Sequence, residues 1–374
     1  FAPVADVSIN PQNPVINVRS FGENPLLVAD KVIAYASGLE SGRVLSVAKH
    51  FPGHGDTDVD SHKALPVLPF TRERLDSVEL YPFRKLIHAG LGGVMVGHLQ
   101  VPVFEPIGKL PSSLSRNVVY TLLTEKMAFK GLIFTDALAM KGVSSAQKVC
   151  LQALKAGNDV VLAPRDVKKE IDYVVEAVKK GEFTEEEIDE RCRKVLLFKY
   201  AMGLNRKPVV RLSGLERRIN TPHTRDLIRR LNLAAVTVLN NEKGVLPIHP
   251  DVKKVAVLTV GKAKELEAFT NELKKYVEVH TFELGKQMPD SLQQKLRDSL
   301  SAYRRIIVPV NEIRLAPYQS FFAKFAPQVP VVYAFFTPAK LMLQIHRAIS
   351  NASSVVLGHT DSDEVQEQIA ALLF

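Results

Sequence analysis

The sequence is poor in cysteine and has no long hydrophobic stretch. Only two cysteines occur in 374 residues, Cys150 and Cys192, and both fall in amphipathic helical patterns. Cysteines placed in this way are predicted to be core residues, which argues against a disulfide framework or a cysteine-based metal site. No window reaches the roughly 20 apolar residues that a membrane-spanning helix requires, so no integral membrane segment is expected.

The amino-terminal end lacks both a starting methionine and a signal peptide. The chain opens on FAPVADV (residues 1–7), which reads as a strand inside a fold rather than as the start of a protein. We therefore expect a fragment of a longer protein. In a fragment, a missing targeting segment says nothing about the compartment.

The charged residues are ordinary in number and basic on balance. Lys and Arg number 49 and Asp and Glu 40, which gives a formal net charge of +9. The basic residues are scattered through helical patterns such as residues 168–182, where they accompany Glu at helical spacing. This pattern is typical of a solvated helix face, so a nucleic-acid partner is not expected.

The first 165 residues alternate short apolar runs with amphipathic segments. Five runs are rich in Val and Ile and apolar on both faces, as buried parallel strands are: residues 1–7, 43–49, 92–98, 131–136 and 159–164. Helical patterns occupy residues 25–39, 72–90, 115–129 and 145–157. Such successive β/α units predict an α/β fold, either a barrel or an open doubly wound sheet.

A second α/β region follows the first. A helix closes the first domain, residues 1–203, and Thr184 and Glu187 can form a capping box at its start. Residues 204–228 are predicted to form an irregular linker. In residues 229–374, strands are expected at 234–240, 254–260, 277–284, 304–310, 329–336 and 353–360. Helical patterns between them predict a separate three-layer α/β/α sandwich domain.

In the first domain, ionisable residues follow the strands rather than the helices. Lys49 and His50 end one strand, His98 follows the next, Asp136 ends a third, and Arg19 lies in the loop after the first. The carboxyl ends of barrel strands surround one active site, so these residues are predicted to converge. Taken singly, His98 could be a structural histidine and Asp136 a helix N-cap.

The loop KHFPGHGDTDVDSH (residues 49–62) concentrates ionisable side chains. Its aspartates are of the kind that forms turns. Four of its residues have side chains that can coordinate zinc or manganese: His50, His54, Asp60 and His62. Their spacing is loose, and Lys49 beside them would repel a cation. We therefore expect no metal and no other cofactor.

Four segments together carry a family resemblance. RSFGENP (19–25), KHFPGHGDTDVDSH (49–62), VMVGHLQVP (94–102) and GLIFTDALAM (131–140) closely resemble the β-N-acetylglucosaminidases of glycoside hydrolase family 3. Residues 234–248 are similar to the start of that family's second domain. The resemblance implies a (β/α)8 TIM-type barrel, of which about three β/α units lie upstream of this chain, followed by an α/β/α sandwich.

The resemblance also implies roles for single residues. Asp136 matches the catalytic nucleophile, His62 the general acid/base and Asp60 its dyad partner. The remaining matches concern the sugar: Arg19, Lys49 and His50 match residues that hold its hydroxyls and acetamido group, and His98 matches a pocket-lining histidine. The family's sugar-binding aspartate on an earlier strand has no counterpart here.

The residues themselves suit this chemistry. A retaining glycosidase needs a nucleophile and a group that first donates and then accepts a proton. A histidine with a pKa near about 6.5 does both at neutral pH, and Asp60 is close enough in sequence to orient the ring of His62. Gly53 and Gly55 permit unusual backbone angles, so residues 56–62 are expected to be mobile without ligand.

We therefore expect a retaining exo-β-N-acetylglucosaminidase acting on sugars derived from peptidoglycan or chitin. The alternatives are a family 3 β-glucosidase-like enzyme, a metal-dependent hydrolase on an α/β barrel, and a sugar-binding module without catalysis. The expected partner is a carbohydrate containing N-acetylglucosamine, and the sequence does not fix the oligomeric state. Because two-domain members of the family are often exported, a periplasmic, cell-envelope or secreted location is favoured over the cytoplasm.

Overall fold

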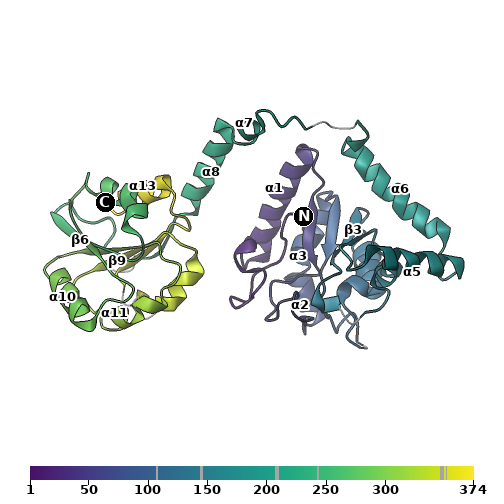
Figure 1. Cartoon of the computed structure of the whole chain (residues 1–374), viewed down its shortest axis with the longest axis horizontal. Coiled ribbons are helices and arrows are strands. Elements are labelled where there is room, and N and C mark those ends of the chain that lie inside the picture. Colours follow the sequence, from purple (N-terminus) through teal and green to yellow (C-terminus); the bar gives the residue numbers. More distant parts are fainter. Residues whose placement is uncertain (107, 144–145, 207–209, 242–243, 346–348, 351) are drawn as a thin grey trace. The chain divides into compact units, whose positions relative to one another are not determined.

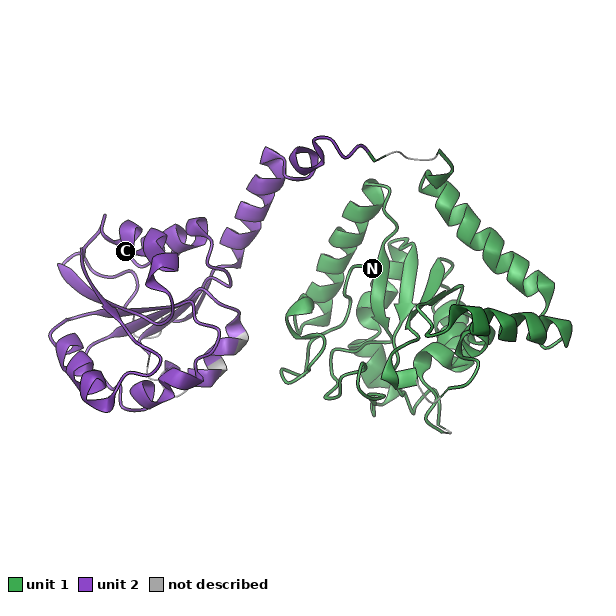
Figure 2. Ribbon diagram, viewed as in Figure 1, with its two compact units in different colours: residues 1–210 green, residues 211–374 purple. Residues whose placement is uncertain are grey.

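The computed structural model describes residues 1–106, 108–143, 146–206, 210–241, 244–345, 349–350 and 352–374 (Figure 1). The chain divides into two compact units, Phe1–Val210 and Arg211–Phe374 (Figure 2). The boundary falls inside the segment 204–228 that was predicted to be a linker.

The first unit is built on a parallel sheet. Its strands are β1 (Val47–Phe51), β2 (Gly93–Val96), β3 (Leu132–Ala137) and β4 (Val160–Leu162). They pair in the order β1-β2-β3-β4, and every pair is parallel. In a doubly wound sheet the strand order reverses at a switch point. In a barrel, neighbouring strands follow one another in sequence, as these four do. The predicted α/β class is confirmed.

The strand expected at residues 1–7 is reduced to an isolated bridge between Val4 and Lys49. The segment still runs beside β1, because the Val47 N–H donates to the Ala2 carbonyl and the Ala5 N–H to the Lys49 carbonyl. Pro3 has no N–H to donate, which limits the ladder that this segment forms.

Helices cover the sheet of the first unit. They are α1 (Pro25–Ser41), α2 (Arg72–Ser77), α3 (Tyr81–His88), the π-helix η3 (Asn117–Lys126), α4 (Val149–Ala156), α5 (Val167–Lys179) and α6 (Glu185–Ala201), with short 3-10 helices η1 (Asn17–Arg19), η2 (Ser112–Leu114), η4 (Lys141–Val143) and η5 (Leu204–Arg206). One large core joins α1, α3 and η3 to the strands. The start of α1 follows from Asn24, whose side chain accepts the backbone N–H groups of Leu26 and Leu27.

Helix α6 begins with the predicted capping box, which Thr184 and Glu187 form in both directions. Cys150 of α4 is buried as predicted, but the prediction for Cys192 is wrong because this side chain is exposed on α6. Helix α6 contacts the core of this unit through Val195 and Phe198 instead.

The second unit has three layers. A six-stranded sheet has the order β5-β10-β9-β8-β6-β7, in which only β5 is antiparallel to its neighbour. The strands are β5 (Thr237–Asn240), β6 (Lys254–Thr259), β7 (Glu278–Glu283), β8 (Ile306–Val310), β9 (Val331–Phe335) and β10 (Ser354–Leu357). The six strands predicted for this region are therefore confirmed.

Both faces of this sheet carry helices, which confirms the predicted sandwich. One core packs the sheet against α8 (Pro222–Ala235), α9 (Glu267–Leu273) and α13 (Asp363–Leu372). A second core on the opposite face involves α10 (Asp290–Leu300), η7 (Ala316–Tyr318), α11 (Gln319–Ala323) and η8 (Ala339–Ile345). Figure 1 shows α13 on one side of β6 and β9, and α10 and α11 on the other. A further 3-10 helix, η6 (Ala263–Leu266), precedes α9.

The predicted irregular linker contains helices instead. Helix α7 (Leu215–Ile219) lies inside it, and α8 begins there and continues through Ala235. The start of α8 is encoded locally, since the Thr221 side chain accepts the Thr224 N–H at 3.1 Å and Pro222 stands at the first helical position.

Candidate active site

A cavity of about 390 Å³ lies at the carboxyl ends of strands β1 and β3. Its lining contains five of the seven predicted site residues: Arg19, Lys49, His50, His62 and Asp136. The other lining residues are Phe1, Val15, His54, Ser61, Met95, Ala137, Leu162 and Ala163. The structure thus brings together side chains that are up to 117 positions apart in the sequence, from Arg19 to Asp136.

Opposite charges share this cavity. Asp136 stands near the end of β3, half-buried, and its Oδ1 accepts the Ala137 N–H at 2.7 Å. Lys49 comes from β1, and its pKa is lowered chiefly by burial and further by the positive charge of Arg19. The negative charges of Asp136 and Asp6 raise the pKa of Lys49 and so partly offset this lowering. One candidate nucleophile is therefore flanked by two cationic side chains.

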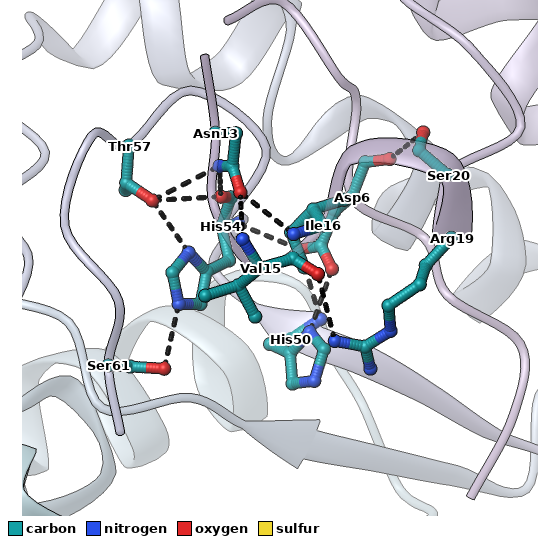
Figure 3. Close-up of polar contacts among 10 residues, drawn as sticks. All are labelled: Asp6, Asn13, Val15, Ile16, Arg19, Ser20, His50, His54, Thr57 and Ser61. Atoms are coloured by element: carbon teal, nitrogen blue, oxygen red, sulfur yellow. Dashed lines mark hydrogen bonds and ion pairs between the residues drawn. The ribbon is translucent and has the colours of Figure 1, made fainter. Parts of the chain in front are cut away.

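Asp6 is a site residue that the sequence reading missed. It is fully buried, its Oδ2 lies 2.7 Å from Nδ1 of His50, and its Oδ1 accepts the backbone N–H groups of His50 at 3.1 Å and His54 at 2.7 Å (Figure 3). Burial raises the pKa of Asp6, but the charge and hydrogen bonds of His50, with His54, outweigh it and hold the pKa below its usual value. An ionised Asp6 makes Nδ1 of His50 the protonated nitrogen, which leaves Nε2 for a ligand.

The signal for Asp6 is present in the sequence. It stands near the end of the apolar run 1–7, where the rule that found Asp136 also applies. The sequence prediction for this run is a strand alone, with Arg19 in the following loop as its contribution to the site.

His54 is a buried residue of the cavity wall and anchors the loop. Its Nδ1 lies 2.7 Å from Oγ1 of Thr57 and its Nε2 lies 3.0 Å from Oγ of Ser61. Asn13 donates to the His54 carbonyl at 2.8 Å and to Thr57 at 3.2 Å (Figure 3). Burial lowers the pKa of His54, so the ring is neutral with both nitrogens engaged. A neutral ring with both nitrogens occupied is not free to bind a metal.

Asp60 and His62 form the predicted pair. Nδ1 of His62 lies 2.8 Å from Oδ1 of Asp60, and the His62 backbone N–H donates to the same oxygen at 2.9 Å. The hydrogen bond from this backbone N–H lowers the pKa of Asp60, and the imidazole adds to the effect. The His62 side chain is 63% exposed, so its Nε2 can reach a bound sugar.

His98 does not line the cavity, contrary to the prediction. It is fully buried, with Nδ1 at 2.7 Å from Oγ of Ser113 and Nε2 at 3.1 Å from the carbonyl oxygen of Ala137. Burial lowers the pKa of His98. A neutral ring that accepts from Ser113 donates through Nε2 to the Ala137 carbonyl, and so fixes the backbone next to Asp136.

Comparisons with known proteins assign the chain to a family. Residues 1–198, more than half of the chain, match the model of the glycosyl hydrolase family 3 N-terminal domain. The chain belongs to glycosyl hydrolase family 3. A solved structure of this family, the β-N-acetylglucosaminidase from Paenibacillus sp. strain FPU-7, superposes with a TM-score of 0.77 at 30% identity, covering 100% of this chain and 73% of that one.

Two family relatives are similar in sequence. β-Hexosaminidase A of Pseudoalteromonas piscicida is 32% identical over 286 residues, which is 71% of this chain and 47% of that protein. β-Hexosaminidase LpqI of Mycobacterium tuberculosis strain H37Rv is 37% identical over 209 residues, 53% of each protein. The chain spans about half the length of the curated relatives it matches.

The loop of residues 49–62 in this family 3 chain is packed more tightly than its glycines suggested. Gly53 has φ +134°, a backbone angle that favours glycine, but a Cβ on Gly55 would lie 1.8 Å from the Val7 carbonyl oxygen. Gly55 is therefore required because the backbone of Val7 packs against it, and not because the loop needs conformational freedom there. Thr57 and Ser61 are buried as well. The predicted mobility of residues 56–62 stays a prediction.

Two further findings concern sites other than the sugar cavity. Among the residues that the structure describes, no three His, Cys, Asp or Glu side chains converge in a way that fits a metal ion. No helix in the described part of the chain is both long enough and apolar enough to cross a membrane.

Proposed function

We propose that this family 3 chain forms the catalytic part of a retaining exo-β-N-acetylglucosaminidase. The observation that carries the proposal is that Asp136 and His62, the latter paired with Asp60, line one cavity with Arg19 and Lys49. The named β-hexosaminidase relatives and the β-N-acetylglucosaminidase structure support the same substrate class.

In the first step, a carboxylate oxygen of Asp136 attacks the anomeric carbon of a terminal β-linked N-acetylglucosamine. His62 donates its Nε2 proton to the glycosidic oxygen while the bond from the anomeric carbon to that oxygen breaks. The products are a covalent glycosyl ester on Asp136 and the released alcohol.

In the second step, His62 is neutral and accepts a proton from a water molecule at Nε2. The water oxygen attacks the anomeric carbon, the ester bond to Asp136 breaks, and the sugar leaves with its original configuration. Asp60 accepts the Nδ1–H of His62 in both steps, which keeps the ring in one orientation and Nε2 toward the substrate.

The cationic and imidazole groups of the cavity suit a sugar with hydroxyl and acetamido groups. Lys49 and Arg19 donate hydrogen bonds and balance the charge of Asp136, and His50 offers Nε2 because Asp6 holds its other nitrogen. Against the metal-dependent alternative, His54, one of its four candidate ligands, has both ring nitrogens engaged by Thr57 and Ser61.

A panel of 4-nitrophenyl glycosides tests the proposal. We expect the β-N-acetylglucosaminide to be cleaved faster than the β-glucoside, with no loss of rate in EDTA. Asp136→Ala should lose several orders of magnitude in kcat. His62→Ala should lose as much on substrates with poor leaving groups and less on the nitrophenyl glycoside, which needs little protonation.

The exposed His88 of α3 lies outside the cavity, and His88→Ala is the matched control that should keep full activity. A preference for the β-glucoside would favour the β-glucosidase-like alternative. Activity that EDTA abolishes would favour the metal-dependent one.

A further inference from the structure

An ion-pair network outside the sugar cavity reaches the loop of residues 49–62. Nη2 of Arg74, in α2, lies 2.9 Å from Oδ2 of Asp56 in the loop and 2.9 Å from Oε1 of Glu79, which stands between α2 and α3. None of these three side chains belongs to the lining of the cavity. The proposed cleavage steps leave the network without a role.

The guanidinium of Arg74 has a fixed position. Thr71 caps α2 by accepting the Arg74 backbone N–H at 3.3 Å, and the guanidinium carbon lies 4.5 Å from the ring centre of Phe70. The Arg74 side chain is only 32% exposed. A guanidinium that packs on an aromatic ring and bonds two carboxylates keeps little freedom, so Arg74 is a rigid partner for Asp56.

Glu79 is the buried member of the network. Its side chain is 1% exposed, and burial raises its pKa, whereas the charge and the hydrogen bond of Arg74 lower it. A Cβ on Gly53 would lie 2.7 Å from the Cβ of Glu79, so the backbone of the loop packs directly on this side chain. The loop is therefore attached to the segment around α2 at two points, Gly53 and Asp56.

Asp56 begins the part of the loop that carries His62. The next residue is Thr57, and its Oγ1 lies 2.7 Å from Nδ1 of His54. Nε2 of the same ring lies 3.0 Å from Oγ of Ser61, the residue before His62. A displacement of Asp56 is therefore passed through Thr57 and the His54 ring to the backbone beside His62.

We propose that Arg74 is a positioning residue for proton transfer by His62. The inference rests on the proposed glycosidase function and deepens it, because it assigns the placement of the acid/base to a side chain outside the cavity. Lys49 and His50 belong to β1, which pairs with β2 independently of this contact. Loss of the contact between Arg74 and Asp56 should displace the acid/base and spare the groups that hold the sugar.

The dependence of kcat/KM on the leaving group tests this proposal. Methyl β-N-acetylglucosaminide requires a proton from the acid/base, whereas the 4-nitrophenyl glycoside of the same sugar requires little. In Arg74→Gln we expect kcat/KM to fall about 100-fold on the methyl glycoside and less than about tenfold on the nitrophenyl glycoside. A smaller folded fraction would lower both values equally, so the difference between the two losses reports the position of the acid/base.

A second variant covers the case in which Arg74→Gln does not fold, because that change leaves buried Glu79 without its partner. Asp56→Ala keeps the ion pair of Arg74 with Glu79 and should give the same unequal losses. The double variant should lose no more than Arg74→Gln alone, since both changes remove one contact. Equal losses on the two glycosides in folded Asp56→Ala overturn the proposal, as does a double variant whose losses multiply.

Arg72→Gln is the matched control on the same helix. Arg72 pairs with Asp76 and its guanidinium lies over the ring of Phe104, so it contacts α2 and a residue far from the loop. We expect both kcat/KM values to stay within about twofold of wild type. The same unequal losses in Arg72→Gln would overturn the assignment to Arg74.

Hydrogen exchange separates this inference from the proposed function. Mass spectrometry should show that the amides of residues 57–62 exchange about tenfold faster in folded Asp56→Ala than in the wild-type chain. Unchanged exchange overturns the inference. If the wild-type chain cleaves neither glycoside, the proposed glycosidase function fails, and the exchange experiment alone decides whether the contact of Arg74 with Asp56 holds the loop.

Discussion

Oδ2 of Asp6 lies 2.7 Å from Nδ1 of His50, and both side chains are buried beside the candidate sugar cavity. Through its other oxygen, the same carboxylate holds the backbone of His54, whose ring reaches Ser61 next to His62. One buried carboxylate thus holds the ring of His50, the proposed sugar-binding histidine, and the loop that carries His62, the proposed acid/base.

The first prediction concerns Asp6→Asn. The amide keeps the size of the carboxylate but loses its charge, so His50 is no longer held in one tautomer. We expect kcat/KM on the 4-nitrophenyl β-N-acetylglucosaminide to fall about 100-fold, the usual consequence of a misplaced binding group. A loss of less than twofold in a folded variant would show that Asp6 does not position His50 for the substrate.

Asp6 also predicts how stability depends on acid. The pKa of Asp6 is lower in the folded chain than in the unfolded chain, where it is about 4. Ionised Asp6 therefore stabilises the fold above about pH 4, and this stabilisation is lost as the pH falls through the pKa of the folded chain. The Tm of wild type should therefore drop more steeply below about pH 4 than the Tm of Asp6→Asn. Parallel curves would contradict an ionised, buried Asp6.

The buried histidines predict a separate effect near neutrality. Burial lowers the pKa of both His54 and His98, so the fold is favoured when they are neutral. Stability should be full above about pH 6.5 and decline as pH falls from there toward the folded pKa values. In His54→Gln the decline of Tm between pH 7 and pH 5 should be shallower. An unchanged slope would mean that His54 is not a buried neutral ring.

Gly55→Ala should destabilise the chain by its volume alone. The added methyl would stand 1.8 Å from the Val7 carbonyl oxygen, so the backbone of one segment must move, at about 3 kcal/mol or more. Gly38→Ala on α1 is the control, because nothing lies within 4 Å of its added carbon, and it should gain roughly 0.5–1 kcal/mol. Urea unfolding measures both, and equal stabilities would contradict the packing found here.

A histidine acid/base also predicts which acceptors the glycosyl intermediate can use. A carboxylate at the position of His62 would repel an anion, whereas a neutral imidazole does not. We expect N-acetylglucosamine 1-phosphate among the products when phosphate is present, and none when sulfate replaces phosphate at equal ionic strength. Mass spectrometry of the products decides, and the absence of any sugar phosphate would end the suggestion.

Much of the fold follows from apolar periodicity, and much of the site from strand ends. Strands β1 to β4 were predicted because their residues are apolar on both faces, and Asp136 because it ends one of them. Helices α7 and α8 are not predicted, because Thr221 and Pro222 are as common in linkers as at the start of a helix. The burial of His98 and the exposure of Cys192 depend on tertiary neighbours that no local pattern reveals.

The identity of the nucleophile is the central claim, and trapping tests it most directly. A 5-fluoro-N-acetylglucosaminyl fluoride slows the release of the glycosyl ester, so the labelled chain can be digested with trypsin and sequenced by mass spectrometry. The account predicts the added sugar on Asp136 within the peptide of residues 131–141, GLIFTDALAMK. A label on any other residue, in a chain that the reagent inactivates, would contradict it.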